Sequence, residues 1–287
     1  MNAGNERIVR RAVGAGQWFP GDRGELQAAV DGYLAEAQPP AVHGRIVAAI
    51  APHAGYQYSG KVAGYTFRAI RDNARESGAP ETVVVIGFAH RVPVRGVALL
   101  DGDALATPLR ETALDKEAAH WLTQSNAVLR LYSRPHAGEW SAENQIPFVQ
   151  TALPEAKLVV ALMGDHEPRT VDALLAALGD LARKRKILVV ASTDLLHDPD
   201  YDLVTKTDQV TLGQIGALDY TGLAKRWQGD FQVCCGIGPV LTALRFAAAQ
   251  GCQTGTVLRY RNSGDDVPSS RGSWVVGYGA VVFAAAE

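Results

Sequence analysis

Residues 45–56 read RIVAAIAPHAGY, an apolar run that ends at a proline and a histidine. Three other runs have the same character: residues 82–87 (TVVVIG), 157–163 (KLVVALM) and 187–192 (ILVVAS). Their hydrophobicity is nearly continuous and does not alternate, which is typical of strands covered by helices on both faces. The four runs therefore predict a buried sheet.

Segments with helical periodicity separate these strands. The first of them, residues 24–35, places Leu26, Val30 and Leu34 on one face. The other helical segments are residues 61–76, 114–124, 169–184, 206–217 and 239–250, and two more strands are expected at residues 256–261 and 273–285. This alternation predicts one three-layer αβα domain over residues 1–287, with a mostly parallel central sheet.

Composition and charge exclude several classes of function. The chain of 287 residues is 47% hydrophobic and 20% charged, with a net charge of −2, so it has no basic surface for nucleic acid or an anionic membrane. The N-terminus has no apolar segment typical of a secretion signal, and the longest apolar run, residues 274–286, is shorter than the roughly 20 residues of a membrane span. The three cysteines, Cys234, Cys235 and Cys252, form no C-x-x-C motif, which indicates a reducing, cytoplasmic location.

Three histidines follow three of the predicted strands. His53 comes after residues 45–51, His90 after residues 82–87, and His197 after residues 187–192. Because ligands bind outside the carboxyl ends of the strands in an open parallel sheet, the three imidazoles are expected to converge in one crevice. A single histidine at such a position is more often an ordinary loop residue, so the prediction depends on the set.

Cys235 is a candidate fourth member of this set. It precedes the apolar helix predicted at residues 239–250, and a thiol at a helix N-terminus favours the thiolate that attacks substrates or binds metals. Its alternative interpretation is a small buried apolar residue. Cys234 is expected to point away, since adjacent side chains diverge in an extended segment. Asp194, which follows the predicted strand at residues 187–192 as His197 does, either orients a nearby group or caps a turn.

Several motifs, in order along nearly the whole chain, resemble those of the Memo family, found in bacteria as AmmeMemoRadiSam system protein B. The most specific match is residues 52–60, PHAGYQYSG. The others are residues 11–20 (RAVGAGQWFP), 192–197 (STDLLH), 235–239 (CGIGP), 260–265 (YRNSGD) and 275–278 (VVGY).

The resemblance implies a fold similar to the class III non-haem iron extradiol dioxygenases. It also implies a metal pocket formed by His53, His90 and Cys235, with His197 close by. Iron and copper have both been associated with the family. Animal members are described as binding phosphorylated receptor peptides, so a protein or phosphopeptide is also an implied class of partner.

Two segments depart from the family pattern. The family usually has Gly-Pro-Ser-His where residues 87–90 read GFAH. Its Glu-His-Ser-x-Glu segment reads EWSAE at residues 139–143, so Trp140 replaces a histidine. Trp140 is expected to narrow the pocket or to stack on a planar substrate. Tyr56 and Arg91 are the other predicted substrate contacts.

The leading hypothesis is a metal-dependent redox enzyme, for example a dioxygenase-like one, that acts on a small molecule. His53, His90 and Cys235 would bind Fe(II) or copper, and zinc also suits such donors. His197 would be a general acid or base, and Asp194 would orient it or another group near the metal.

Two alternatives remain open. In a cysteine-dependent hydrolase or transferase, Cys235 would be the nucleophile, His197 or His53 the base and Asp194 the orienting group, with the backbone amides of residues 236–238 as an oxyanion hole. In a non-catalytic binding module, the histidines and Arg91 would bind an anionic or phosphorylated ligand.

Overall fold

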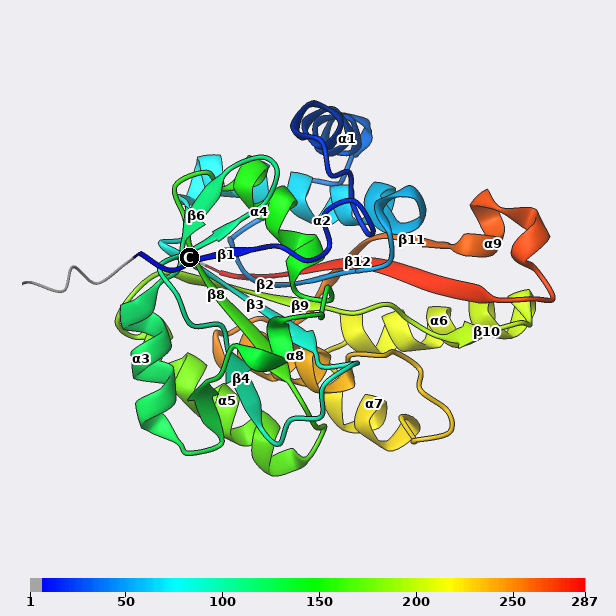
Figure 1. The fold of residues 1–287 in the computed structure, drawn as a ribbon. Helices are drawn as coiled ribbons and strands as arrows, with labels where there is room; N and C mark the ends of the chain where they lie inside the picture. Colours follow the sequence, from blue (N-terminus) through cyan, green and yellow to red (C-terminus); the bar gives the residue numbers. More distant parts are fainter. Residues whose placement is uncertain (1–6, 287) are drawn as a thin grey trace, which may run out of the picture.

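The four apolar runs form the centre of the main sheet. They are β2 (Arg45–Ala51), β9 (Ile187–Ser192), β3 (Thr82–Phe88) and β8 (Lys157–Met163), which pair in parallel in that order (Figure 1). The structure, a computed structural model, describes residues 7–286. Residue 287 and residues 1–6, on which the expectation of no secretion signal partly rests, lie outside the described residues.

The margins of the sheet are mainly antiparallel. β12 (Val275–Ala285) pairs antiparallel with β2, with β11 (Thr256–Asn262) and with β10 (His197–Asp198). At the other margin β4 (Val97–Leu99) is antiparallel to β8 and parallel to β7 (Leu129–Leu131). The described sheet of nine strands is therefore mixed, and the prediction of a mostly parallel sheet applies only to its centre. β11 and β12 are consecutive in the chain, and the connection between them does not cross the sheet. Strands joined in this way pair antiparallel.

A small second sheet lies beside the main one. It consists of β1 (Val9–Arg11), β5 (Ala104–Ala106) and β6 (Glu111–Ala113), with β1 parallel to β5 and β5 antiparallel to β6. Runs of three residues are too short to show a periodic pattern, so these strands have no signal in the sequence.

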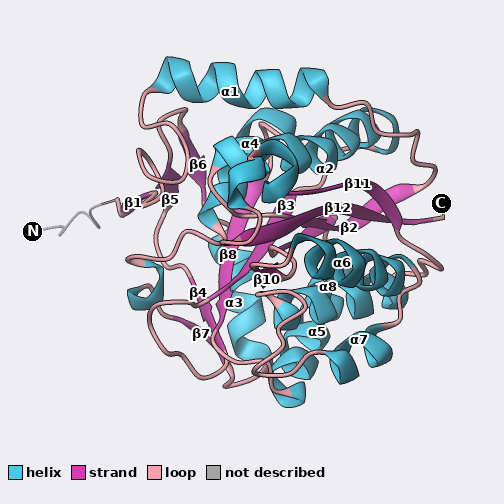
Figure 2. Ribbon diagram, turned by 90° about the vertical axis from the view of Figure 1, so that its right-hand side faces the viewer, coloured by secondary structure: helices cyan, strands magenta, loops and turns pink. Residues whose placement is uncertain are grey.

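Helices cover both faces of the main sheet (Figure 2). On one face lie α2 (Tyr56–Ser77) and α4 (Ile146–Ala152), and α1 (Arg23–Glu36) packs on α2. On the other face lie α3 (Lys116–Ser125), α5 (Pro168–Ala182), α6 (Tyr201–Gly216) and α8 (Ile237–Ala249). The remaining described helices are α7 (Tyr220–Arg226), α9 (Ser263–Asp266) and the 3-10 turns Arg134–His136, Glu143–Gln145 and Pro268–Ser270. No helix among the described residues is long and apolar enough to cross a bilayer.

Burial on both faces explains the continuous hydrophobicity of the central strands. In β3, Val84 and Ile86 pack in the core that includes α5 and α8, whereas Val83 and Val85 pack in the core that includes α2. All four side chains are fully buried. Burying such a side chain contributes about 1.5–3 kcal/mol relative to leaving it exposed. Both alternate positions of the strand therefore need apolar residues, and its carboxyl end is held firmly in place.

Two helices begin earlier than their periodicity predicts. α6 begins at Tyr201 because the Asp200 side chain accepts hydrogen bonds from the backbone N–H of Asp202 and Leu203, at 2.9 and 3.0 Å. α2 begins at Tyr56, directly after the loop that carries His53, so the helix fixes the far end of this loop.

Candidate metal centre

Three donor side chains meet at the carboxyl ends of the central strands. His53 follows β2, His90 follows β3, and Cys235 precedes Gly236, the N-cap residue of α8. One ligand atom from each residue lies within 4.8 Å of the other two. The two imidazole rings meet edge to face, with centroids 5.4 Å apart. The structure thus brings together the three residues for which a metal was predicted.

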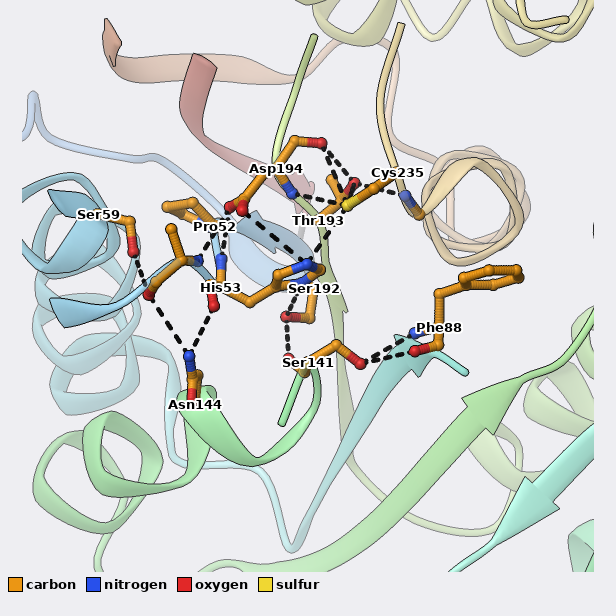
Figure 3. A network of polar contacts seen from close by, with 12 residues as sticks. Pro52, His53, Ser59, Phe88, Ser141, Asn144, Ser192, Thr193, Asp194 and Cys235 are labelled. Carbon is orange, nitrogen blue, oxygen red and sulfur yellow. Dashed lines mark hydrogen bonds and ion pairs between the residues drawn. The ribbon is translucent and has the colours of Figure 1, made fainter. Parts of the chain in front are cut away.

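His53 is held by contacts of its backbone and its ring with four neighbouring residues (Figure 3). Its backbone N–H donates to Asp194 Oδ1 at 2.8 Å, and its carbonyl accepts from Asn144 Nδ2 at 2.6 Å. Ring atom Nδ1 lies 3.1 Å from Ser192 Oγ. The side chain is 3% exposed, and its other ring nitrogen, Nε2, lies 3.3 Å from Cys235 Sγ. Nε2 is therefore the donor atom that His53 presents to the centre.

His90 is oriented by a buried carboxylate. Glu139 Oε2 accepts from the His90 backbone N–H at 2.7 Å, and Oε1 lies 3.0 Å from ring atom Nδ1. Burial lowers the pKa of His90, but its interactions with Cys235 and Glu139 outweigh this effect and raise the pKa to about 9. Burial raises the pKa of Glu139, but the hydrogen bond and positive charge of His90 lower it overall. An imidazole paired in this way through Nδ1 keeps Nε2 for a ligand.

The sulfur of Cys235 lies among polar hydrogens at the start of α8. Sγ accepts from the Asp194 backbone N–H at 3.3 Å, lies 3.5 Å from Thr193 Oγ1 and donates to the Asp194 carbonyl at 3.7 Å, so its neighbours include both a donor and an acceptor. Its neighbour Cys234 is fully buried in the core, where burial raises the pKa of the thiol. The two adjacent side chains therefore have opposite environments, and only Cys235 faces the donor group.

Asp194 positions the loop of His53. Its Oδ1 accepts from the backbone N–H of His53 and of Ala54, at 2.8 and 3.2 Å, and Oδ2 lies 4.0 Å from His53 Nε2. The carboxylate is buried, with 4% of the residue exposed. The structure therefore places Asp194 against His53, and no hydrogen bond joins it to His197 among the described residues.

His197 lies beside the donor group rather than in it. It lines a cleft of about 320 Å³ together with Cys235 and Trp274. Its Nε2 is buried and has no hydrogen-bond partner among the described residues. Burial lowers the pKa of His197, and the nearby His53 and His90 lower it further, against the opposite effect of Asp194. The environment of His197 therefore favours the neutral imidazole.

The three predicted substrate contacts have different positions. Trp140 stacks on Trp18, with centroids 4.1 Å apart, and on His90, with centroids 5.6 Å apart, and the Arg91 guanidinium lies 5.0 Å from its ring. Trp140 therefore packs against the ring of His90 and supports it. Tyr56 was expected to contact the substrate. It lies in the core instead, where it is 4% exposed and its hydroxyl donates to the Asn144 carbonyl at 2.8 Å.

The pairing of Glu139 with His90 has no signal in the sequence. Glu139 lies in a long polar loop in which an acidic residue also suits a helix cap, and nothing local joins it to a histidine 49 residues earlier. The same loop is fastened to the strand ends by Ser141, whose hydroxyl donates to the Phe88 carbonyl at 2.9 Å and whose carbonyl accepts from Ser192 Oγ. These contacts depend on loop geometry that a sequence pattern does not contain.

We expect Glu139→Gln to weaken metal binding about tenfold, because residues that orient a metal-binding histidine typically contribute ten- to a hundredfold to affinity. Competition with a chromophoric chelator measures the change. Glu143→Gln is the matched control, since Glu143 is a buried carboxylate of the same loop that accepts from the backbone N–H of Val13 and Gly14 instead. Equal affinities for Fe(II) in both variants and the parent protein would show that Glu139 does not support His90.

The fold and the donor group define a class: an α/β protein whose helix-covered sheet carries, at its strand ends, a His-His-Cys group able to bind a metal ion. A family model described as "Memo-like protein" matches residues 10–282, and the chain belongs to the Memo family. This confirms the resemblance found in the motifs.

Relatives match over almost their full lengths. A MEMO1 family protein of Methanopyrus kandleri is 35% identical over an alignment of 290 positions, which spans 96% of this chain and 99% of the relative. A MEMO1 family protein of Methanothermobacter thermautotrophicus is 31% identical, and the alignment spans 94% of this chain and 99% of the relative. Among solved structures, an uncharacterised protein of Escherichia coli K12 matches with a TM-score of 0.47 and 13% identity, over 82% of this chain and 99% of that chain.

Proposed function

We propose that this protein is a metal-dependent oxidoreductase that acts on a small molecule, with chemistry similar to that of the class III extradiol dioxygenases. His53, His90 and Cys235 bind the ion, which is Fe(II) or copper. The observation that carries the proposal is the convergence of two imidazole nitrogens and one thiol within 4.8 Å of one another.

The spacing of the donors supports a shared ion. Metal–nitrogen and metal–sulfur bonds of about 2.1 and 2.3 Å place adjacent ligand atoms roughly 3–3.6 Å apart. His53 Nε2 and Cys235 Sγ, at 3.3 Å, already have this separation. A thiolate with two imidazoles suits copper, zinc or thiolate-tolerant iron, and only the first and last of these are redox-active.

A redox-active ion held here would supply Lewis acidity and one-electron chemistry. The chain supplies the surroundings. Glu139 and Asp194 fix the positions of His90 and His53. His197 lies beside Cys235 in the cleft, its Nε2 has no hydrogen-bond partner among the described residues, and burial lowers its pKa, so Nε2 would accept a proton from a hydroxyl of the bound substrate. We also propose that the protein works in the cytoplasm and that its substrate is a small molecule.

Oxygen uptake with catechol as the probe tests this function. Protein loaded anaerobically with Fe(II) or Cu(I) should consume oxygen, whereas zinc-loaded and metal-free protein should not. His197→Gln should lower the rate about a hundredfold or more, as the loss of a general base does, and should leave the metal content unchanged. Uptake that is the same with zinc as with iron and copper would contradict the proposal.

A cysteine-dependent hydrolase is the second candidate, because Cys235 Sγ lies 3.3 Å from His53 Nε2. However, two of the three backbone amides of its expected oxyanion hole already donate to other groups. The Gly236 N–H donates to Thr193 Oγ1 at 2.8 Å, and the Gly238 N–H donates to His166 Nδ1 at 3.2 Å. A hydrolase would keep its activity in the presence of a chelator and lose it on alkylation.

A binding module using Arg91 would bind a phosphopeptide without forming a product.

A further inference from the structure

A cleft leads from Cys235 to the surface between three segments of the chain. It is lined by residues 195–198, which follow β9, by residues 229–232, which precede α8, and by Trp274, which precedes β12. Its volume of about 320 Å³ is within the range of small-molecule sites. We propose that this cleft selects a planar aromatic compound that carries a cationic amino group. The inference rests on the proposed function, because it takes the cleft to be the substrate's path to the metal.

The aromatic preference follows from two exposed side chains. Trp274 is 56% exposed and Phe231 is 38% exposed, although side chains of this size are usually well buried. Both line the same cleft. The Trp274 indole stands edge-on to the His197 imidazole, with centroids 6.0 Å apart, so it borders the path toward Cys235. A planar ligand ring between Trp274 and Phe231 would cover apolar surface and gain aromatic contacts.

The cationic preference follows from the charges. The lining contains Asp198 and Asp230, and no lysine or arginine lines the cleft in the part of the chain that the structure describes. Asp198 Oδ1 accepts from the Asp200 N–H at 2.8 Å, which holds the carboxylate in place and leaves its other oxygen available. Asp198 is half-buried and Asp230 is exposed. Two carboxylates that line one cleft attract an ammonium group and repel a carboxylate. The exposed indole face attracts a cation as well.

These two preferences define the ligand. Its ring enters between Trp274 and Phe231, its amino group pairs with Asp198 or Asp230, and the ring edge approaches Cys235 and His197. An arylalkylamine has this chemistry, whereas an aryl carboxylate of the same size lacks it.

The test uses metal-free protein, so that its outcome does not depend on the metal proposal. Phenethylammonium, 2-phenylethanol and phenylacetate have the same ring and differ in charge. We expect saturation-transfer NMR titrations to show phenethylammonium binding about tenfold more tightly than phenylacetate, with the alcohol between them. Trp274→Ala should weaken phenethylammonium binding about tenfold. The double substitution of Asp198→Asn and Asp230→Asn should abolish the preference for the cation.

Tyr220→Ala is the matched control, because Tyr220 is a similarly exposed aromatic residue, 39% exposed, outside the cleft lining. It should leave binding unchanged. Equal binding of the three compounds, or a Trp274→Ala variant that binds like the parent, would overturn the inference. Loss of metal binding in other experiments would refute the proposed function and would leave this charge preference measurable.

Discussion

Cys235→Ser and His53→Ala should each lose stoichiometric metal after anaerobic purification. Each substitution removes one of three donors, and a serine hydroxyl is a poor ligand for a soft ion. Structural zinc sites bind with about 10–16 kcal/mol over four ligands, so the loss of one donor should cost about a hundredfold or more in affinity. Elemental analysis, followed by titration with Fe(II) and Cu(I), measures the effect.

Two control variants show whether the loss is specific. Cys252→Ser removes a buried thiol elsewhere in the core, and His120→Ala removes a histidine whose ring contacts Gln124 on the exposed face of α3. Both should retain the metal content of the parent protein. If neither Cys235→Ser nor His53→Ala changes the metal content, the assignment of these ligands is wrong.

Asp194→Ala should have the second largest effect, a loss of about 2–4 kcal/mol in the free energy of unfolding. The substitution leaves the backbone N–H groups of His53 and Ala54 without their acceptor, and an unsatisfied buried donor costs about 1–3 kcal/mol. Because His53 is then less well positioned, metal affinity should fall as well. Asp194→Asn keeps one oxygen as an acceptor and should therefore lose only about half as much free energy of unfolding as Asp194→Ala.

Urea denaturation measures this prediction as a shift of the midpoint at constant slope. Asp198→Ala is a suitable control, since its carboxylate caps a backbone N–H at the surface and should change stability by about 0.5 kcal/mol or less. An Asp194→Ala variant as stable as the control would show that Asp194 does not hold the His53 loop.

The centre of the fold could be predicted because burial on both faces leaves a strong signal. β2, β3, β8 and β9 coincide closely with the four apolar runs. The margins could not be predicted in the same way. A strand pattern carries no direction, so the antiparallel pairing of β12 with β2 was not visible. The three-residue strands are too short for periodicity.

The meeting of His53 and His90 could be predicted because both follow parallel strands, whose carboxyl ends share one edge of the sheet. Position alone placed His197 with them, and only the resemblance to the Memo family separated His197 from the metal ligands. Cys235 joined them through its place before α8. The partners of these ligands depend on loop geometry instead. Glu139 reaches His90 across a sequence separation of 49 residues, and Tyr56, three residues after His53, turns into the core with the first turn of α2.

X-ray absorption spectroscopy of the iron- or copper-loaded protein would decide whether Cys235 and the histidines bind the ion, because it reports the atoms bonded to the metal. We expect one sulfur neighbour at about 2.3 Å with nitrogen neighbours at about 2.0–2.1 Å, and loss of the sulfur signal in Cys235→Ser. A spectrum with only nitrogen and oxygen neighbours, unchanged by this substitution, would contradict this expectation.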